Sequence, residues 1–175
     1  MNKVLIVYYS RSGTTRQVAQ QLQLMSDWAI GEVRDVHARA GLGGDLRCIV
    51  DSLFARSAPY RYEGPALEDF DRLIVLAPIW LDGLAAPMRA LLRDMNRAGP
   101  PLSLVCVMSR RGAFRAADEI TTIVGAEPVP VLGLTQADVL SGRCRPALQS
   151  LIDTVKAIGS EPVVMRPIWL LPEAA

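Results

Sequence analysis

Short runs of apolar, β-branched residues alternate along this chain with segments whose apolar residues recur at helical spacing. The run at residues 4–8 is apolar throughout, as in a strand that is buried on both faces. Behind it, Val18, Leu22 and Met25 are spaced as on one face of a helix. The same alternation predicts strands at residues 4–8, 31–36, 72–77, 102–108 and 128–134, and helices at residues 14–25, 45–55, 84–97, 114–124 and 145–158.

Strands that alternate with helices favour a parallel sheet with helices packed on it. We therefore predict an α/β fold: a doubly wound five-stranded parallel sheet with helices on both faces, in a single domain over residues 1–175. Pro130 indicates an edge position for the last strand. Residues 42–62 carry the weakest pattern, and the tail at 162–172 is compatible with either a short extra strand or a surface segment.

Composition narrows the classes of function. The 175 residues suffice for one domain with its own core. A net charge of +1 gives no reason to expect nucleic acid or an anionic membrane as a partner. No apolar run approaches the roughly 20 residues of a bilayer span, and the first run is too short for a signal peptide, so we expect a cytoplasmic protein.

Metal and disulfide chemistry have few candidate residues. Cys48, Cys106 and Cys144 lie far apart in the sequence, which predicts small core residues rather than a disulfide framework or a metal site. His37 is the single histidine, and its place after the second predicted strand favours a surface or loop role. Tyr8 is expected to pack within the first strand.

The first predicted strand runs into the polar sequence Tyr9-Ser10-Arg11-Ser12-Gly13-Thr14-Thr15. In a doubly wound sheet, ligands bind beyond the carboxyl ends of the strands, where strand order reverses. Backbone N–H groups at a helix start, with hydroxyl side chains beside them, form an anion site. The chain lacks the glycine-rich dinucleotide pattern and the lysine-containing triphosphate loop, so a monophosphate ester is the expected ligand. The alternative is a turn that only caps a helix.

These residues resemble the phosphate loop of the flavodoxin family, whose pattern is [ST]-x-[ST]-G-x-T. Ser10, Ser12, Gly13 and Thr15 match it, with Arg11 and Thr14 at the free positions. After the third predicted strand, Pro78-Ile79-Trp80-Leu81-Asp82-Gly83 looks like the family loop that covers one face of the isoalloxazine ring. The resemblance implies a flavodoxin-like fold and FMN as the cofactor.

Trp80 is the expected stacking residue, because a wide aromatic ring packs well against a flat tricyclic one. The alternative for Trp80 is a core or interface role. Asp82 and Gly83 either supply a backbone group to flavin N5 or form a turn and a helix cap.

The third loop, Ser109-Arg110-Arg111-Gly112, departs from the electron-carrier flavodoxins. Those proteins place a stacking tyrosine there amid acidic residues, and this chain has neither. Arginines beside the ring would stabilise the reduced anion, and Arg110 or Arg111 would also suit a nicotinamide nucleotide phosphate. The alternative is a solvated pair of charges. Phe114 is expected to begin a buried helix face, and the alternative is that it substitutes for the missing tyrosine. Tyr60 and Tyr62 are placed in a long loop.

Three functions follow as hypotheses. The first is an FMN-dependent oxidoreductase that passes electrons or hydride, with NAD(P)H as donor, to a small acceptor such as a quinone. The second is a non-enzymatic carrier that docks on a redox partner protein, which the near-zero net charge disfavours. The third is a flavin-free protein of the same fold that binds another phosphate ester. Related reductases imply a homodimer as a further possibility.

Overall fold

The computed structural model describes residues 2–36, 59–80, 83–95, 99–108 and 112–158. The predicted helix at 45–55, His37, Cys48 and the tail at 162–172 lie outside these residues. The strands are β1 (Val4–Tyr9), β2 (Ala29–Asp35), β3 (Tyr60–Glu63), β4 (Arg72–Trp80), β5 (Gly83–Leu84), β6 (Leu102–Met108) and β7 (Val131–Thr135). The helices are α1 (Thr14–Ser26), α3 (Ala86–Asp94), α4 (Ala113–Val124), α5 (Gln136–Leu140) and α6 (Arg145–Ile158), with a 3-10 turn at Leu67–Asp69.

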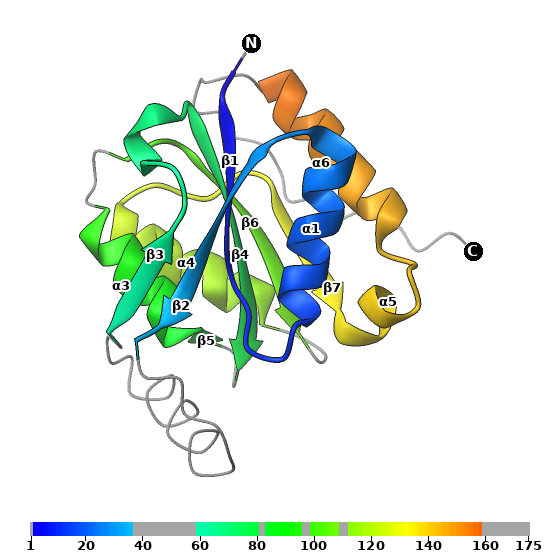
Figure 1. The fold of residues 1–175 in the computed structure, drawn as a ribbon, viewed down its shortest axis with the longest axis horizontal. Coiled ribbons are helices and arrows are strands. Elements are labelled where there is room, and N and C mark those ends of the chain that lie inside the picture. The colour runs from blue at the N-terminus through cyan, green and yellow to red at the C-terminus, as the bar shows by residue number, and fades with distance from the viewer. Residues whose placement is uncertain (1, 37–58, 81–82, 96–98, 109–111, 159–175) are drawn as a thin grey trace.

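The sheet has the order β3-β2-β1-β4-β6-β7, with β5 paired to β4 alone. Strands β2, β1, β4, β6 and β7 are mutually parallel, as the sequence predicts. Figure 1 shows α1 and α6 on one side of this sheet and α3 and α4 on the other. The chain order reverses between β1 and β4, which are neighbours in the sheet. The ligand-binding rule for such sheets therefore directs attention to the segments that follow these two strands.

Two cores lie on the two faces of the sheet. Every residue of β1 is buried, because helices cover both of its faces. Leu5, Val7 and Tyr9 belong to the core shared with α3 and α4, whereas Ile6 and Tyr8 belong to the core shared with α1 and α6. Among the described residues, no helix is both long enough and apolar enough to cross a bilayer.

The prediction that Tyr60 and Tyr62 lie in a long loop is wrong. These residues form β3, which pairs antiparallel with β2 at the edge of the sheet. Tyr60 and Tyr62 are half-buried and Arg61 and Glu63 are exposed, so the four residues alternate with the period of a strand that has one face in solvent. With β5, the described residues form seven strands rather than the five predicted.

Other boundaries also shift. β4 continues to Trp80, so Pro78, Ile79 and Trp80 lie in a strand and not in the loop that we expected. Pro78 fits there because the pairing of β4 with β1 ends at Leu76. Within the described residues α3 is shorter than predicted, because it starts at Ala86 with Pro87 in its first turn. The last strand begins at Val131, after Pro130, and lies at the sheet edge as predicted.

Candidate functional site

The loop between β1 and α1 lies at the carboxyl edge of the sheet, beside the reversal of strand order. Gly13 has φ +91, a left-handed conformation that side-chain-bearing residues adopt at a cost, and it precedes the first residue of α1. A Cβ atom at Gly13 would meet no atom within 4 Å. The backbone therefore turns here into helix α1 and leaves open space over the turn.

Polar groups face this turn without full partners. Ser10 Oγ is buried and has no hydrogen-bond partner in the described structure. No side chain caps the start of α1, and its first turn carries no acidic residue. The first N–H groups of a helix have no intrahelical acceptors, so they attract an anion. Thr14 and Thr15 are buried, and the Thr14 hydroxyl lies 3.5 Å from that of Ser12.

Trp80, in the predicted ring-covering segment at residues 78–83, contacts Tyr9, the last residue of β1 before the Ser10–Thr15 loop. The half-buried indole lies edge-on to the ring of Tyr9, with ring centroids 6.1 Å apart and an interplanar angle of 81°. Tyr9 is buried, and its hydroxyl donates a 2.7 Å hydrogen bond to Asp35 Oδ2 at the end of β2. The packing of Tyr9 therefore supports Trp80 at the carboxyl edge, next to the Ser10–Thr15 loop.

Other predicted site residues are placed as follows. Ile79 is in the core, Pro78 is half-buried, and Gly83 pairs with Trp80 where β5 runs antiparallel to β4. Gly112 precedes α4 with φ +127, at the same sheet edge. Leu81, Asp82, Ser109, Arg110 and Arg111 lie outside the described residues.

The expectation for Phe114 is wrong. Its side chain is 58% exposed, in the first turn of α4, whereas Ala113, Ala116 and Ala117 form the buried face of that helix. Small alanines, and not the aromatic ring, allow α4 to approach the sheet closely. Tyr8, Cys106 and Cys144 are buried as predicted, and burial raises the pKa of Cys106 to about 12, so this thiol stays protonated.

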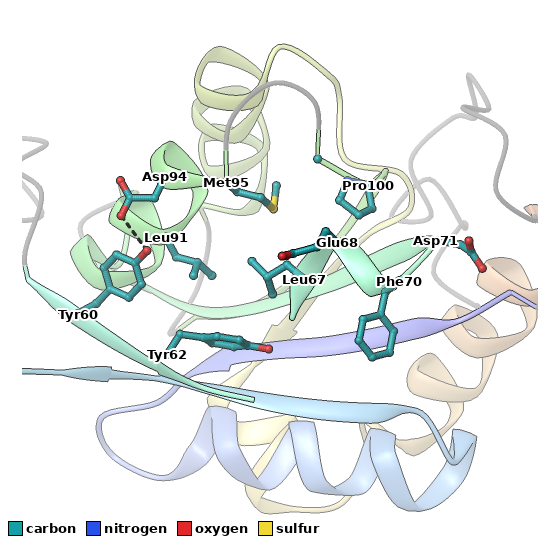
Figure 2. A pocket seen from close by; sticks show the side chains of 11 residues that line it. Tyr60, Tyr62, Leu67, Glu68, Phe70, Asp71, Leu91, Asp94, Met95 and Pro100 are labelled. Carbon is teal, nitrogen blue, oxygen red and sulfur yellow. Dashed lines mark hydrogen bonds between the residues drawn. The ribbon is translucent and has the colours of Figure 1, made fainter. Parts of the chain in front are cut away.

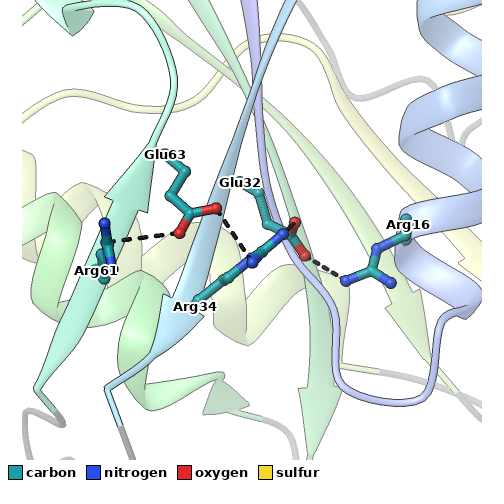
Figure 3. Close-up of polar contacts among 5 residues, drawn as sticks. All are labelled: Arg16, Glu32, Arg34, Arg61 and Glu63. Atoms are coloured by element: carbon teal, nitrogen blue, oxygen red, sulfur yellow. Dashed lines mark hydrogen bonds and ion pairs between the residues drawn. The ribbon is translucent and has the colours of Figure 1, made fainter. Parts of the chain in front are cut away.

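A row of charged residues that the sequence did not indicate begins next to the loop (Figure 3). Arg16, in the first turn of α1, contacts Glu32 at 2.5 Å, and Arg34 contacts the other oxygen of Glu32 at 2.8 Å. Arg34 also reaches Glu63 on β3 at 3.2 Å. The charge of Arg16 is thus compensated by Glu32, which leaves Arg11, the helix terminus and neutral hydroxyls as the described features that favour an anion at the loop.

We expect Glu32 to make folding stability depend on pH. Burial favours the neutral acid, but hydrogen bonds from Arg16 and Arg34 outweigh it and hold the pKa of Glu32 below its ordinary value. A carboxylate with a lowered pKa in the folded state stabilises above its unfolded pKa and loses that contribution as pH falls through the folded pKa. Because both arginines are about half exposed, Glu32→Gln should cost only about 1 kcal/mol at neutral pH.

Urea unfolding of both proteins over a pH series checks this expectation. The stability difference between wild type and Glu32→Gln should be constant near neutral pH and vanish under acid. Glu63→Gln is the matched control, and its effect should be smaller because the Glu63 side chain is 37% exposed against 10% for Glu32. A difference that persists unchanged into strong acid would contradict the role given to Glu32.

A cavity of about 630 Å³ lies elsewhere in the molecule (Figure 2). Leu67, Phe70 and Pro100, which help to line it, precede β4 and β6, so they lie toward the amino edge of the sheet. Tyr60 and Tyr62 complete its wall, and burial raises the pKa of each phenol to about 12. This cavity is therefore separate from the loop at the carboxyl edge, and the candidate site is the loop.

A scan against protein-family models and a search of curated proteins each gave no match. Solved structures do match. A flavoprotein from Lactobacillus acidophilus in complex with FMN has a TM-score of 0.64 and 18% identity, over 81% of this chain and 98% of that one. A flavodoxin from Fusobacterium nucleatum bound to flavin mononucleotide has a TM-score of 0.57 and 12% identity, over 91% and 99%.

The oxidised flavodoxin 2 of Bacillus cereus is similar at a TM-score of 0.52 and 18% identity, over 87% of this chain and 99% of that one. At identities this low, the structural similarity establishes the fold alone. The chain has a flavodoxin-like α/β fold, with the Ser10–Thr15 loop at the point of strand reversal.

Proposed function

We propose that this chain is a flavoprotein that binds FMN, with the phosphate at the Ser10–Thr15 loop and the ring beside Trp80. The observation that carries the proposal is the buried, unpartnered Ser10 Oγ next to the open, left-handed turn at Gly13. A buried hydroxyl without a partner costs free energy, which a ligand oxygen would recover. The FMN-bound structures of the same fold support the choice of ligand.

The residues present fit this cofactor. Ser10 Oγ and the N–H groups at the start of α1 would donate to the phosphate oxygens, and the positive end of the helix dipole would favour their charge. Gly13 allows close approach of the backbone. The half-buried indole of Trp80, supported by Tyr9, would offer an aromatic surface to the ring.

Bound FMN would supply the redox chemistry, accepting electrons or hydride and passing them to an acceptor. The chain would hold and orient it. Cys106 is unsuited to a nucleophilic role, because its thiol is fully buried and stays protonated. We propose NAD(P)H as donor and a small acceptor such as a quinone, on the strength of Arg110 and Arg111 in the sequence of the third loop.

Retention of flavin tests the proposal. Purified protein is mixed with FMN or with riboflavin, desalted, and examined by visible absorbance. We expect FMN to be retained and riboflavin to be largely lost, because riboflavin lacks the phosphate that the loop would hold. Protein that retains neither would contradict FMN binding, and equal retention of both would contradict the loop as the phosphate site.

The same sample tests the proposed electron donor. Anaerobic addition of NADH or NADPH should bleach the bound flavin, and a quinone should restore its colour. Bound FMN that neither nucleotide bleaches, but that a chemical reductant does, would favour the electron carrier that docks on a protein partner.

A further inference from the structure

An ion pair between a buried arginine and a partly buried glutamate contacts the short strand β5. Arg89 on α3 is 1% exposed, and its Nε donates to Glu119 Oε1 on α4. The two residues also contact the backbone of one residue of β5, Leu84. Leu84 N–H donates to Glu119 Oε2 at 3.0 Å, and Arg89 Nη2 donates to the carbonyl of Leu84 at 2.9 Å.

Leu84 itself explains why these contacts matter. Its side chain is fully buried, so its N–H and carbonyl groups need partners inside the protein. β5 has only two residues and pairs only with the end of β4, through Ile79 and Trp80. A strand this short is not fixed by its own ladder. Arg89 and Glu119 therefore tie the hairpin to two helices at once.

An ion pair is a costly way to fill a protein interior. Taking the Arg89 charge fully out of water and the Glu119 charge largely so is unfavourable, and apolar side chains of similar volume often give equal or greater stability. A role in fixing one arrangement of the hairpin would account for the pair here. The hairpin carries Trp80 at one end and Gly83 at the other, which are paired with each other across it.

We propose that Arg89 and Glu119 are positioning residues that hold the β4–β5 hairpin in the arrangement that receives the flavin ring. The inference rests on the proposed function, because it assigns these residues a role toward bound FMN. They would act on the ring through the backbone N–H and carbonyl of Leu84, whereas Ser10 would act on the phosphate. The two groups of residues should therefore alter FMN binding in different ways.

Glu119→Gln tests the inference. The substitution preserves the volume but removes the charge and one of the two acceptor oxygens. Glu119 therefore loses its hydrogen bond from Leu84 N–H or the one from Arg89 Nε. We expect FMN affinity to fall about tenfold, as for about 1.4 kcal/mol, and the visible spectrum of bound FMN to shift. Ser10→Ala should lower FMN affinity by a similar factor with no shift in the spectrum, because it changes only the phosphate contact.

Asp118→Asn is the matched control. Asp118 lies next to Glu119 on α4, and its exposed side chain has no described polar partner, so the variant removes the same charge without touching the hairpin. It should bind FMN as wild type does. Should Glu119→Gln fail to fold, Arg89→Met with Glu119→Leu removes both charges without leaving one buried alone, and the same changes in affinity and spectrum are expected.

Wild-type protein is measured first. If it does not bind FMN, the proposed function is wrong and the inference falls with it. If wild type binds FMN and the Glu119→Gln or double variant binds it with unchanged affinity and spectrum, only the inference is wrong, even where thermal stability falls. A spectral shift and weaker binding that Asp118→Asn does not reproduce would support it.

Discussion

Gly13→Ala is expected to weaken FMN binding by roughly tenfold to thirtyfold, or about 1.4–2 kcal/mol, because its methyl group would project into the space that the proposal gives to the phosphate. Gly13 has φ +91 at the residue before α1, and no protein atom lies within 4 Å of the position of an added Cβ. The alanine therefore meets no steric conflict within the described protein. Within the protein its cost is the left-handed backbone strain, which lowers stability, whereas the loss of affinity comes from the methyl group.

Gly142→Ala separates strain from binding. Gly142 has φ +74, and a Cβ there also meets no atom within 4 Å, but it lies in the turn between α5 and α6. Both variants should lose similar stability in thermal unfolding without flavin. Titration of FMN into each protein should then show a loss of affinity for Gly13→Ala alone. Equal affinities for the two variants would remove the Gly13 turn from the site.

The sequence predicts the parallel part of the fold because each of its strands is long enough to show a pattern. β1, β4 and β6 are apolar runs buried on both faces, and α6 covers the residues that its spacing indicates. The loop that follows β1 is likewise predicted, since hydroxyls and a glycine between a buried strand and a helix indicate a turn. What such local patterns identify is the edge of the sheet at which a ligand is expected.

Features that depend on distant contacts escaped prediction. Nothing local distinguishes Arg89 from a solvated arginine, because its partner Glu119 lies 30 residues further along the chain. β5 has two residues and shows no periodicity. β3 is different, because the alternation of Tyr60, Arg61, Tyr62 and Glu63 is a strand pattern. Pro59 and Gly64, which lie on either side of it, indicate a loop and outweigh this short pattern.

The packing of β3 on β2 leads to the second large effect. We expect Gly31→Ala to destabilise the fold by about 2 kcal/mol, because overpacking a fitted contact costs about 1–3 kcal/mol. A Cβ at Gly31 would lie 2.7 Å from two ring carbons of Tyr62. That ring cannot easily move, because its hydroxyl donates to the carbonyl of Pro65 at 2.8 Å and its hydroxyl end also lies against Gly64.

Gly133→Ala supplies the comparison that isolates this cause. A Cβ at Gly133 would lie 2.6 Å from Met108 Cε, an equally close approach, but to the free end of a flexible side chain. The methionine can turn aside, so we expect a loss below about 1 kcal/mol. At about 2–4 °C per kcal/mol for a chain of this size, the two variants should differ measurably in Tm.

Removing the Tyr62 ring should also remove the loss of stability caused by Gly31→Ala. In a Tyr62→Ala background, which loses stability of its own, the added Gly31→Ala change should have little further effect, and a double-mutant cycle measures that coupling. If Gly31→Ala costs the same with and without the Tyr62 ring, the loss arises from the strand backbone and not from the ring. Strong coupling would instead establish that a side chain at Gly31 is excluded by the Tyr62 ring, a contact that adds to the backbone pairing of β3 with β2.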